Sequence, residues 1–184
     1  MPLTISFQLT DKDLEHFTAR MNEARANAST MGEAAICESA NGLLADVRGR
    51  EMPEFVRERI EKLAMLVLMV EDKSWNISGE DRARIVDAIA YVADPEDMIP
   101  DHIPGIGLLD DAIMIELVCK DLRPDMEAYD DFCKYRDKEV ARRGPEGRDL
   151  SQATWLSARR AQLHERMRRR RASMWASRLG RSPF

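Results

Sequence analysis

The chain has few of the residues that build disulfide-stabilised or zinc-stabilised modules. Among its 184 residues there are three cysteines and three histidines, all widely separated, and no Cys-x-x-Cys pair. An odd number of distant cysteines argues against a disulfide framework, and the histidine spacing does not fit a zinc module. We therefore expect reduced thiols, a cytoplasmic location and no cofactor.

Long apolar stretches are also missing. The longest uninterrupted run, LAMLVLMV, covers residues 63–70, whereas a helix that crosses a bilayer needs about 20 apolar residues. The N-terminus has neither the basic flank nor the apolar stretch of a signal peptide. The sequence predicts no transmembrane span and places the apolar run in a buried helix.

Sequence motifs of well-known enzyme classes are absent as well. The chain contains no glycine-rich phosphate loop, no HExxH or GxSxG motif and no dinucleotide fingerprint. No residue can therefore be assigned a catalytic role from the sequence. This favours a non-enzymatic protein.

What the chain does contain is typical of helices. Hydrophobic residues make up 44% and charged residues 33%, and there are 11 methionines but only 6% aromatics. Good helix formers are abundant and runs of β-branched residues are nearly absent. Apolar spacing predicts an all-α bundle of about six helices followed by a long basic C-terminal helix, with a short extended arm at residues 3–9. The expected helices cover residues 11–28, 31–47, 53–71, 78–94, 106–122 and a stretch from about 124.

Helix start signals support several of these boundaries. Thr10 can cap the first helix, with acidic residues in the first turn where negative charge is favoured. Pro53 suits the first position of the third helix. Ser78 and Asp81 form a pair that resembles a capping box at the start of the fourth helix.

A proline- and aspartate-rich connection, residues 94–111, joins two of the predicted helices. Its prolines fix the backbone, its glycines allow sharp bends, and its aspartates can accept backbone N–H groups in turns and at a helix start. The segment resembles the YkvA-like family of bacterial helical proteins (domain of unknown function 1232) over residues 80–122. The resemblance implies a helical fold and no known activity. It is carried by Tyr91, Pro95, Asp97, Pro100, Asp101, Pro104, Gly107, Asp110 and Asp111.

The same connection also supports an alternative hypothesis. Hard divalent cations take six or more oxygen ligands, and a helix–loop–helix connection could bring several carboxylates together. On this hypothesis the protein would bind a divalent metal or act as a metal-dependent hydrolase. The proposed ligands are Asp97, Asp101, Asp110 and Asp111.

The C-terminal part of the chain differs from the rest in charge. Residues 148–184 hold ten arginines, no lysine and two acidic residues, a net charge of +8, while the whole chain carries −5, which leaves −13 for residues 1–147. A Gly-Pro-Glu-Gly break precedes the basic part. We therefore divide the chain into an acidic helical body, 1–143, and an arginine-rich tail, 148–184.

The tail is predicted to form a basic amphipathic helix over residues 150–178, with Leu156, Leu163, Met167 and Met174 near one face. It could fold back on the acidic body, contact an acidic protein or a second copy, bind nucleic acid, or bind an anionic membrane surface. We favour an interaction or structural module that acts through its acidic body and basic helix. The candidate partner-binding residues are Arg159, Arg160, Arg166, Arg168, Arg169, Arg170, Arg171 and Trp175.

Overall fold

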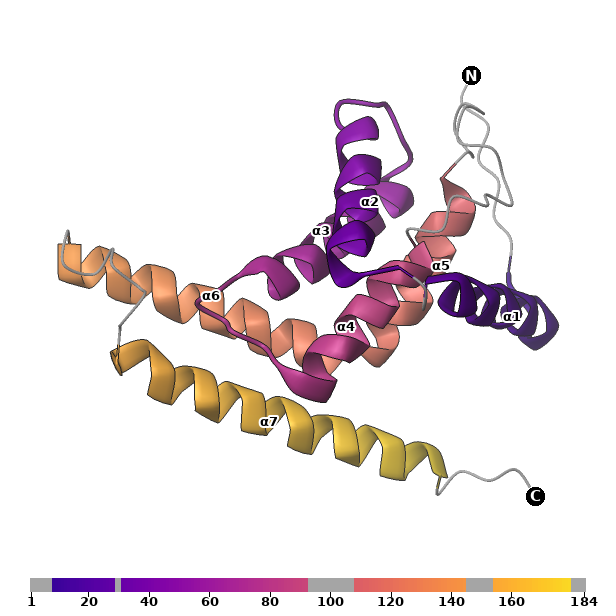
Figure 1. Ribbon diagram of the computed structural model, residues 1–184. Helices are drawn as coiled ribbons and strands as arrows, with labels where there is room; N and C mark the ends of the chain where they lie inside the picture. The colour runs from indigo at the N-terminus through magenta and orange to yellow at the C-terminus, as the bar shows by residue number, and fades with distance from the viewer. Residues whose placement is uncertain (1–7, 29–30, 93–107, 145–153, 180–184) are drawn as a thin grey trace.

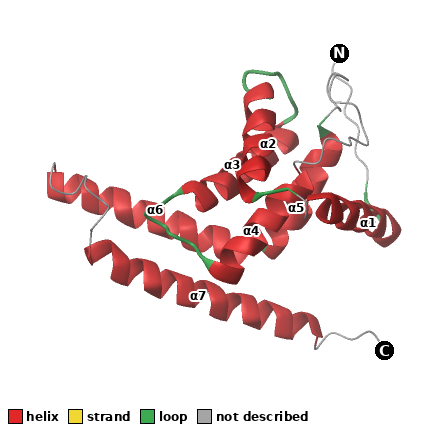
Figure 2. Ribbon diagram, in the orientation of Figure 1, coloured by secondary structure: helices red, strands yellow, loops and turns green. Residues whose placement is uncertain are grey.

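A computed structural model describes residues 8–28, 31–92, 108–144 and 154–179, and all regular structure in these ranges is α-helical (Figure 2). The predicted all-α fold is confirmed. Within these ranges, six helices precede residue 144 and a seventh lies after it. The helices are α1 (Asp11–Ala28), α2 (Glu33–Asp46), α3 (Glu54–Glu71), α4 (Gly79–Val92), α5 (Leu109–Asp121), α6 (Arg123–Arg143) and α7 (Thr154–Leu179).

The helices α1 to α5 pack together, and α6 of the body forms a long antiparallel pair with α7. Helices α2 and α3 lie side by side, α3 also packs against α5, and α4 contacts α1, α2, α3 and α5. Helix α7 runs back along α6, and these two long helices form one side of the molecule (Figure 1). The basic helix predicted from the sequence therefore lies against the body.

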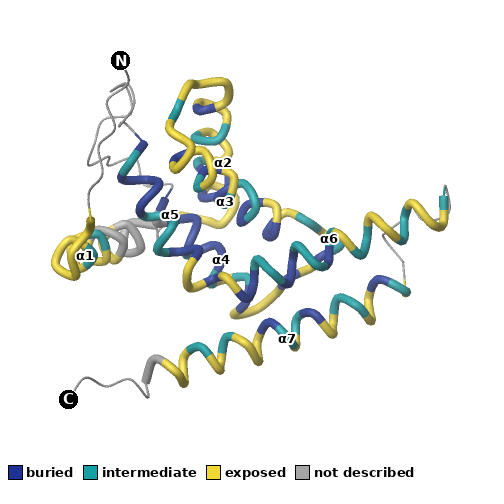
Figure 3. Tube along the Cα trace, turned by 180° about the vertical axis from the view of Figure 1, so that it is seen from behind, coloured by how far each residue is buried: buried dark blue, intermediate teal, exposed yellow. Residues whose placement is uncertain are grey.

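In the described ranges, one cluster of buried apolar residues connects α2, α3, α4, α5, α6 and α7. Its fully buried side chains include Trp75, Leu63 and Ile89 from the body, and Leu163 and Met167 from α7. The buried residues of α7 fall on the side that faces α6 (Figure 3). This is the amphipathic face that the sequence predicts for the tail.

Local signals explain where several helices begin. The Thr10 backbone N–H donates to Asp13 Oδ2 at 2.8 Å, and the Asp13 N–H donates to the Thr10 hydroxyl at 3.4 Å, so Thr10 caps α1 reciprocally. Pro53 is the N-cap of α3, so the helix begins at Glu54, one residue later than predicted. At the other end of α6, Gly144 has φ +66°, a left-handed conformation that glycine adopts without strain and that ends the helix.

Two expectations need correction or fall outside the described residues. Five residues of the apolar run 63–70 are buried as predicted, Ala64 and Met65 are half-buried, and Leu68 is 54% exposed. The N-terminal arm lies mostly outside the described ranges. No helix in the described part of the chain is long and apolar enough to cross a membrane.

Candidate functional site

The proline- and aspartate-rich connection is described only at its two ends. Pro95, Asp97, Pro100, Asp101, Pro104 and Gly107 lie outside the described residues. Tyr91 belongs to the last turn of α4. The arrangement proposed for this segment therefore stays a prediction, apart from its last two aspartates.

Asp110 and Asp111 lie in the first turn of α5, as predicted, and both are buried. Negative charge is favoured there by the helix dipole, and both side chains interact with other groups of the protein. Within the described ranges, no group of three or more His, Cys, Asp or Glu residues could hold a metal ion. Two of the four proposed metal ligands are thus placed at a helix start, and the other two are not described.

The predicted partner-binding arginines mostly contact the body of the same chain. Arg168 Nε donates to Asp81 Oδ2 at 2.7 Å, and Arg171 bonds Asp81 through one nitrogen and Asp125 Oδ1 at 2.8 Å through the other. Asp81 comes from the first turn of α4 and Asp125 from the first turn of α6. One arginine of α7 therefore joins two other helices.

We call Asp81, Asp125, Arg168 and Arg171 the α4–α6–α7 charge cluster. The two carboxylates and Arg171 are largely removed from solvent, whereas the Arg168 side chain is 55% exposed. Asp125 is fully buried and Asp81 is 5% exposed. Burial raises the pKa of Asp125 despite the nearby Arg171, whereas at Asp81 the hydrogen bonds from Arg171 and Arg168 outweigh burial and lower the pKa. Burial and the neighbouring Arg171 lower the pKa of Arg84, which faces the same cluster. A buried carboxylate of this kind is stable in its charged form only when a nearby cation offsets the cost of removing it from water.

Further arginines extend the contact along α7. Arg166 pairs with Asp131 at 2.5 Å and Arg170 with Glu127 at 2.5 Å. The Arg160 guanidinium donates to the backbone carbonyl of Ser74 at 3.0 Å. Together with the α4–α6–α7 charge cluster, these bonds connect both halves of α7 to the body.

Three of the predicted partner-binding residues are arranged differently. Arg159 donates to Gln162 on its own helix at 2.7 Å and lies over the Tyr135 ring. Arg169 is exposed, and Trp175 is 53% exposed near the end of α7. These residues have no ion pair with the body among the described contacts.

His164 connects α7 to the aromatic part of the core. Its ring meets Trp75 edge-on, with 4.2 Å between ring centroids, and Trp75 in turn lies 4.9 Å from the Phe132 ring. Burial, followed by the charge of Arg168, lowers the pKa of His164 to about 4. His164 is therefore neutral at physiological pH and behaves as part of the apolar interface.

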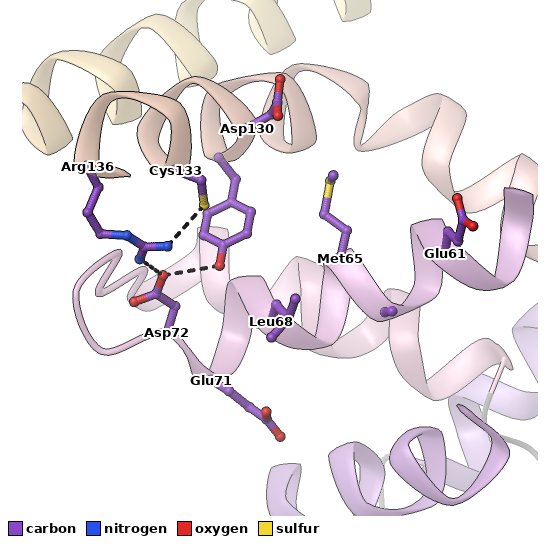
Figure 4. A pocket seen from close by; sticks show the side chains of 10 residues that line it. Glu61, Met65, Leu68, Glu71, Asp72, Asp130, Cys133 and Arg136 are labelled. Carbon is purple, nitrogen blue, oxygen red and sulfur yellow. Dashed lines mark hydrogen bonds and ion pairs between the residues drawn. The ribbon is translucent and has the colours of Figure 1, made fainter. Parts of the chain in front are cut away.

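A second feature, between α3 and α6, is an open pocket of about 580 Å³ (Figure 4). We call it the α3/α6 pocket. Side chains from α3 and its C-cap face side chains from α6 across it. Its lining consists of Glu61, Ala64, Met65, Leu68, Glu71, Asp72, Tyr129, Asp130, Cys133 and Arg136.

A hydrogen-bonded hub at Asp72 forms one end of this pocket (Figure 4). The Asp72 carboxylate accepts bonds from the Ser74 backbone N–H at 2.8 Å, the Tyr129 hydroxyl at 3.1 Å and the Arg136 guanidinium. Burial opposes ionisation of Asp72, but the bonds from Ser74 and Arg136 outweigh it and lower the pKa. Burial beside the Asp72 charge raises the pKa of Tyr129. The hub is a satisfied structural unit.

Cys133 in the pocket and the buried Cys119 are not activated as nucleophiles. Burial raises the pKa of Cys133, and it raises the pKa of the buried Cys119 to about 12. A thiol with a raised pKa is a poor nucleophile near neutral pH because little thiolate is present. The pocket therefore combines an apolar floor with carboxylates and lacks an evident nucleophile.

Sequence reasoning did not identify the α3/α6 pocket. Its residues lie in two helices about 60 positions apart, and their pairing depends on the tertiary fold. The exposed Leu68 lies within the apolar run 63–70, and periodicity alone does not separate it from its buried neighbours.

Comparison with known proteins gives one match. Residues 81–117, which include most of α4 and α5, match the model of a family described as a protein of unknown function (DUF1232). The predicted resemblance to that domain is confirmed over this segment. No curated protein and no solved structure matches the chain significantly.

Proposed function

Starting from a segment that matches a family of unknown function, we propose that this chain is a non-enzymatic helical interaction module with a protein partner. In this proposal α7 is an internal clamp that holds the body together, and the exposed acidic surface of the body is left for the partner. The cytoplasm is the proposed location, because free cysteines are typical of a reducing compartment.

One observation carries the proposal: the arginines of α7 are used within the chain. Four of the eight predicted partner-binding residues pair with carboxylates of the body, namely Arg166, Arg168, Arg170 and Arg171. A carboxylate bonded to a guanidinium neutralises its charge and occupies part of its donors, which weakens its attraction for a phosphate. This arrangement disfavours nucleic acid and anionic membranes as partners.

The chemistry of the α3/α6 pocket supports binding over catalysis. Asp72 has a lowered pKa and accepts several hydrogen bonds, which leaves it a weak general base. Tyr129 and Cys133 have raised pKa values, so neither provides an activated nucleophile near neutral pH. Asp72, Tyr129 and Cys133 therefore fit a structural role in the wall of a binding pocket.

A comparison of two double variants tests the clamp. Glu127→Gln/Asp131→Asn removes the carboxylates that pair with Arg170 and Arg166. Binding of a labelled duplex DNA of about 30 base pairs is measured by anisotropy at roughly 100 mM NaCl, where non-specific contacts are weak. We expect wild type to show no binding at about 10 μM protein and the variant to bind at that concentration, because Arg166 and Arg170, and also Arg123, lose a paired carboxylate.

The matched control is Glu15→Gln/Glu38→Gln, which removes the same charge from exposed positions of α1 and α2. This control should behave like wild type. Salt-sensitive binding of wild type to DNA, or to vesicles containing phosphatidylserine, would contradict the proposal because it would show that the arginines are available.

A further inference from the structure

We infer that the α3/α6 pocket is a docking site for a basic amphipathic helix of a protein partner. This inference deepens the proposed function and rests on it, because it assigns the partner's place and chemistry. The argument uses the floor of the pocket, its rim and its rigid end.

The floor is apolar and adaptable. Met65 and Leu68 project from α3 beside the partly buried Cys133 of α6 (Figure 4). Leu68 is 54% exposed, whereas its chain neighbours Val67 and Met69 are buried. Methionine fills irregular gaps because its chain is unbranched and its sulfur is polarizable. Such a floor suits aliphatic side chains of varied shape.

The rim is acidic on both sides. Glu61 and Glu71 come from α3 and Asp130 comes from α6. Asp130 pairs with the exposed Lys134 one turn along, and Glu71 accepts a bond from Asn41 at 3.0 Å. Exposed pairs of this kind contribute little to stability, so an incoming cation can replace Lys134. The rim therefore favours lysine or arginine next to the apolar anchors.

The Asp72 carboxylate at the end of the pocket does not bind the lysine or arginine of the partner. This carboxylate is paired with Arg136 and also bonded by Ser74 and Tyr129. Because the wall is held from both α3 and α6, the two helices keep a fixed separation beside the floor. The site is thus preformed on rigid elements, which lowers the ordering cost of binding.

The apolar floor, the acidic rim and the rigid end of the pocket together favour a basic amphipathic helix as the ligand. A pocket of about 580 Å³ falls within the roughly 300–1,000 Å³ range of binding pockets, enough for the anchor side chains of a helix. A groove between two helices with an apolar floor is the geometry in which amphipathic helices dock. Charge complementarity then requires a basic helix, since an acidic helix would face Glu61, Glu71 and Asp130.

The probe is a helical peptide of about fourteen leucines and lysines arranged with one apolar face, labelled at its N-terminus. It is titrated with the full-length protein and followed by anisotropy at roughly 100 mM NaCl. We expect binding of one peptide per chain with a Kd on the order of 10 μM. A scrambled peptide of the same composition and an analogue with glutamate in place of lysine should not bind.

Two variants with the same change of charge test the location. Leu68→Lys alters the floor, while Met31→Lys alters another exposed hydrophobic residue, 45% exposed, which lies two residues before α2. We expect the Kd to rise at least tenfold for Leu68→Lys and to stay within twofold for Met31→Lys. Circular dichroism and melting curves should match wild type for both, because each side chain is exposed.

Equal loss of binding in both variants would overturn the inference, because it would show non-specific attraction to an acidic protein. Binding that is unchanged by Leu68→Lys, or shared by the scrambled peptide, would overturn it too. These outcomes are independent of the clamp, which is tested by DNA binding of variants at Glu127 and Asp131. Failure at the pocket with an intact clamp would therefore refute the docking site alone.

Discussion

Helix α6 packs against α7 along one face and against α3 along another, and the two interfaces differ in how their polar groups are arranged. Toward α7, buried carboxylates meet arginines that lie far away in sequence, as at Asp125 and Arg171. Toward α3, a satisfied hub at Asp72 adjoins an open pocket with an exposed leucine. The first interface is closed by the chain itself, and the second leaves apolar and acidic groups in contact with solvent.

High charge does not by itself mark a binding surface in this molecule. The α7 arginines stand out in the sequence, yet the structure pairs four of them with the body. The α3/α6 pocket has no unusual composition, yet Leu68 on its floor is exposed although its chain neighbours Val67 and Met69 are buried. Stability is expected to depend on the first interface and partner binding on the second.

The largest expected effect comes from Arg171→Met. This change leaves the buried Asp81 and Asp125 without their shared cation, and breaking a buried pair costs about 3–5 kcal/mol. We expect the free energy of unfolding in urea to fall by about 3 kcal/mol. The neighbouring Arg169→Met is the control and should change it by less than about 0.5 kcal/mol, since Arg169 is exposed. Equal effects would mean that the arginine run acts only through its total charge.

A pair of leucine truncations compares the two interfaces directly. Leu163 on α7 is 1% exposed, so Leu163→Ala should cost about 2–3 kcal/mol through lost burial and a residual cavity. Leu68→Ala at the pocket should cost less than about 0.5 kcal/mol. Chemical denaturation measures both. A large loss for Leu68→Ala would show that the pocket floor is part of the folded core.

Acidification should weaken the α7 interface through His164. Its pKa is about 4 in the folded protein and about 6.5 in an unfolded chain. Between these values the unfolded state binds the proton and the folded state does not, so stability falls as pH falls. From pH 7.5 to pH 5 the loss is at most about 2 kcal/mol.

The control for this pH effect is His164→Leu, which should remove most of that dependence. Asp72 and Asp81, whose pKa values are lowered, lose their contribution only as pH falls below about 4. They therefore lie outside the pH 7.5–5 window. A variant that keeps the full slope in this window would assign the effect to other groups.

The smallest effect concerns the hub beside the pocket. Tyr129→Phe removes the hydroxyl that donates to Asp72 at 3.1 Å and leaves the ring in place. We expect a loss of about 1 kcal/mol in the free energy of unfolding, because Asp72 keeps its bonds from Ser74 and Arg136. A loss above about 3 kcal/mol would show that the hub is less redundant than its contacts indicate.

Local signals predicted the helices well because caps and apolar spacing are encoded by neighbouring residues. Thr10 caps α1 as expected, and Leu163 and Met167 lie on the predicted buried face of α7. The partners across helices were not predictable in this way. Asp81 reads as part of a capping pair, yet its carboxylate accepts hydrogen bonds from Arg168 and Arg171.

The candidate site shows the same limit. The α7 arginines were identified from charge alone, but the choice between an internal and an external partner depends on where distant carboxylates lie. The α3/α6 pocket depends on how α3 and α6 pack, which no local pattern reports. The metal hypothesis for Asp97 and Asp101 stays a prediction, since both lie outside the described residues.

Hydrogen–deuterium exchange along α7 tests the central claim most directly, because it measures whether this helix is held by the body in solution. If α7 is an internal clamp, backbone amides of residues 156–171 should exchange as slowly as those of the α6 segment 126–140 that faces them. Arg171→Met should speed exchange in α7 more than in α3. Exchange of α7 at the rate of an isolated helix in the wild-type protein would contradict the account.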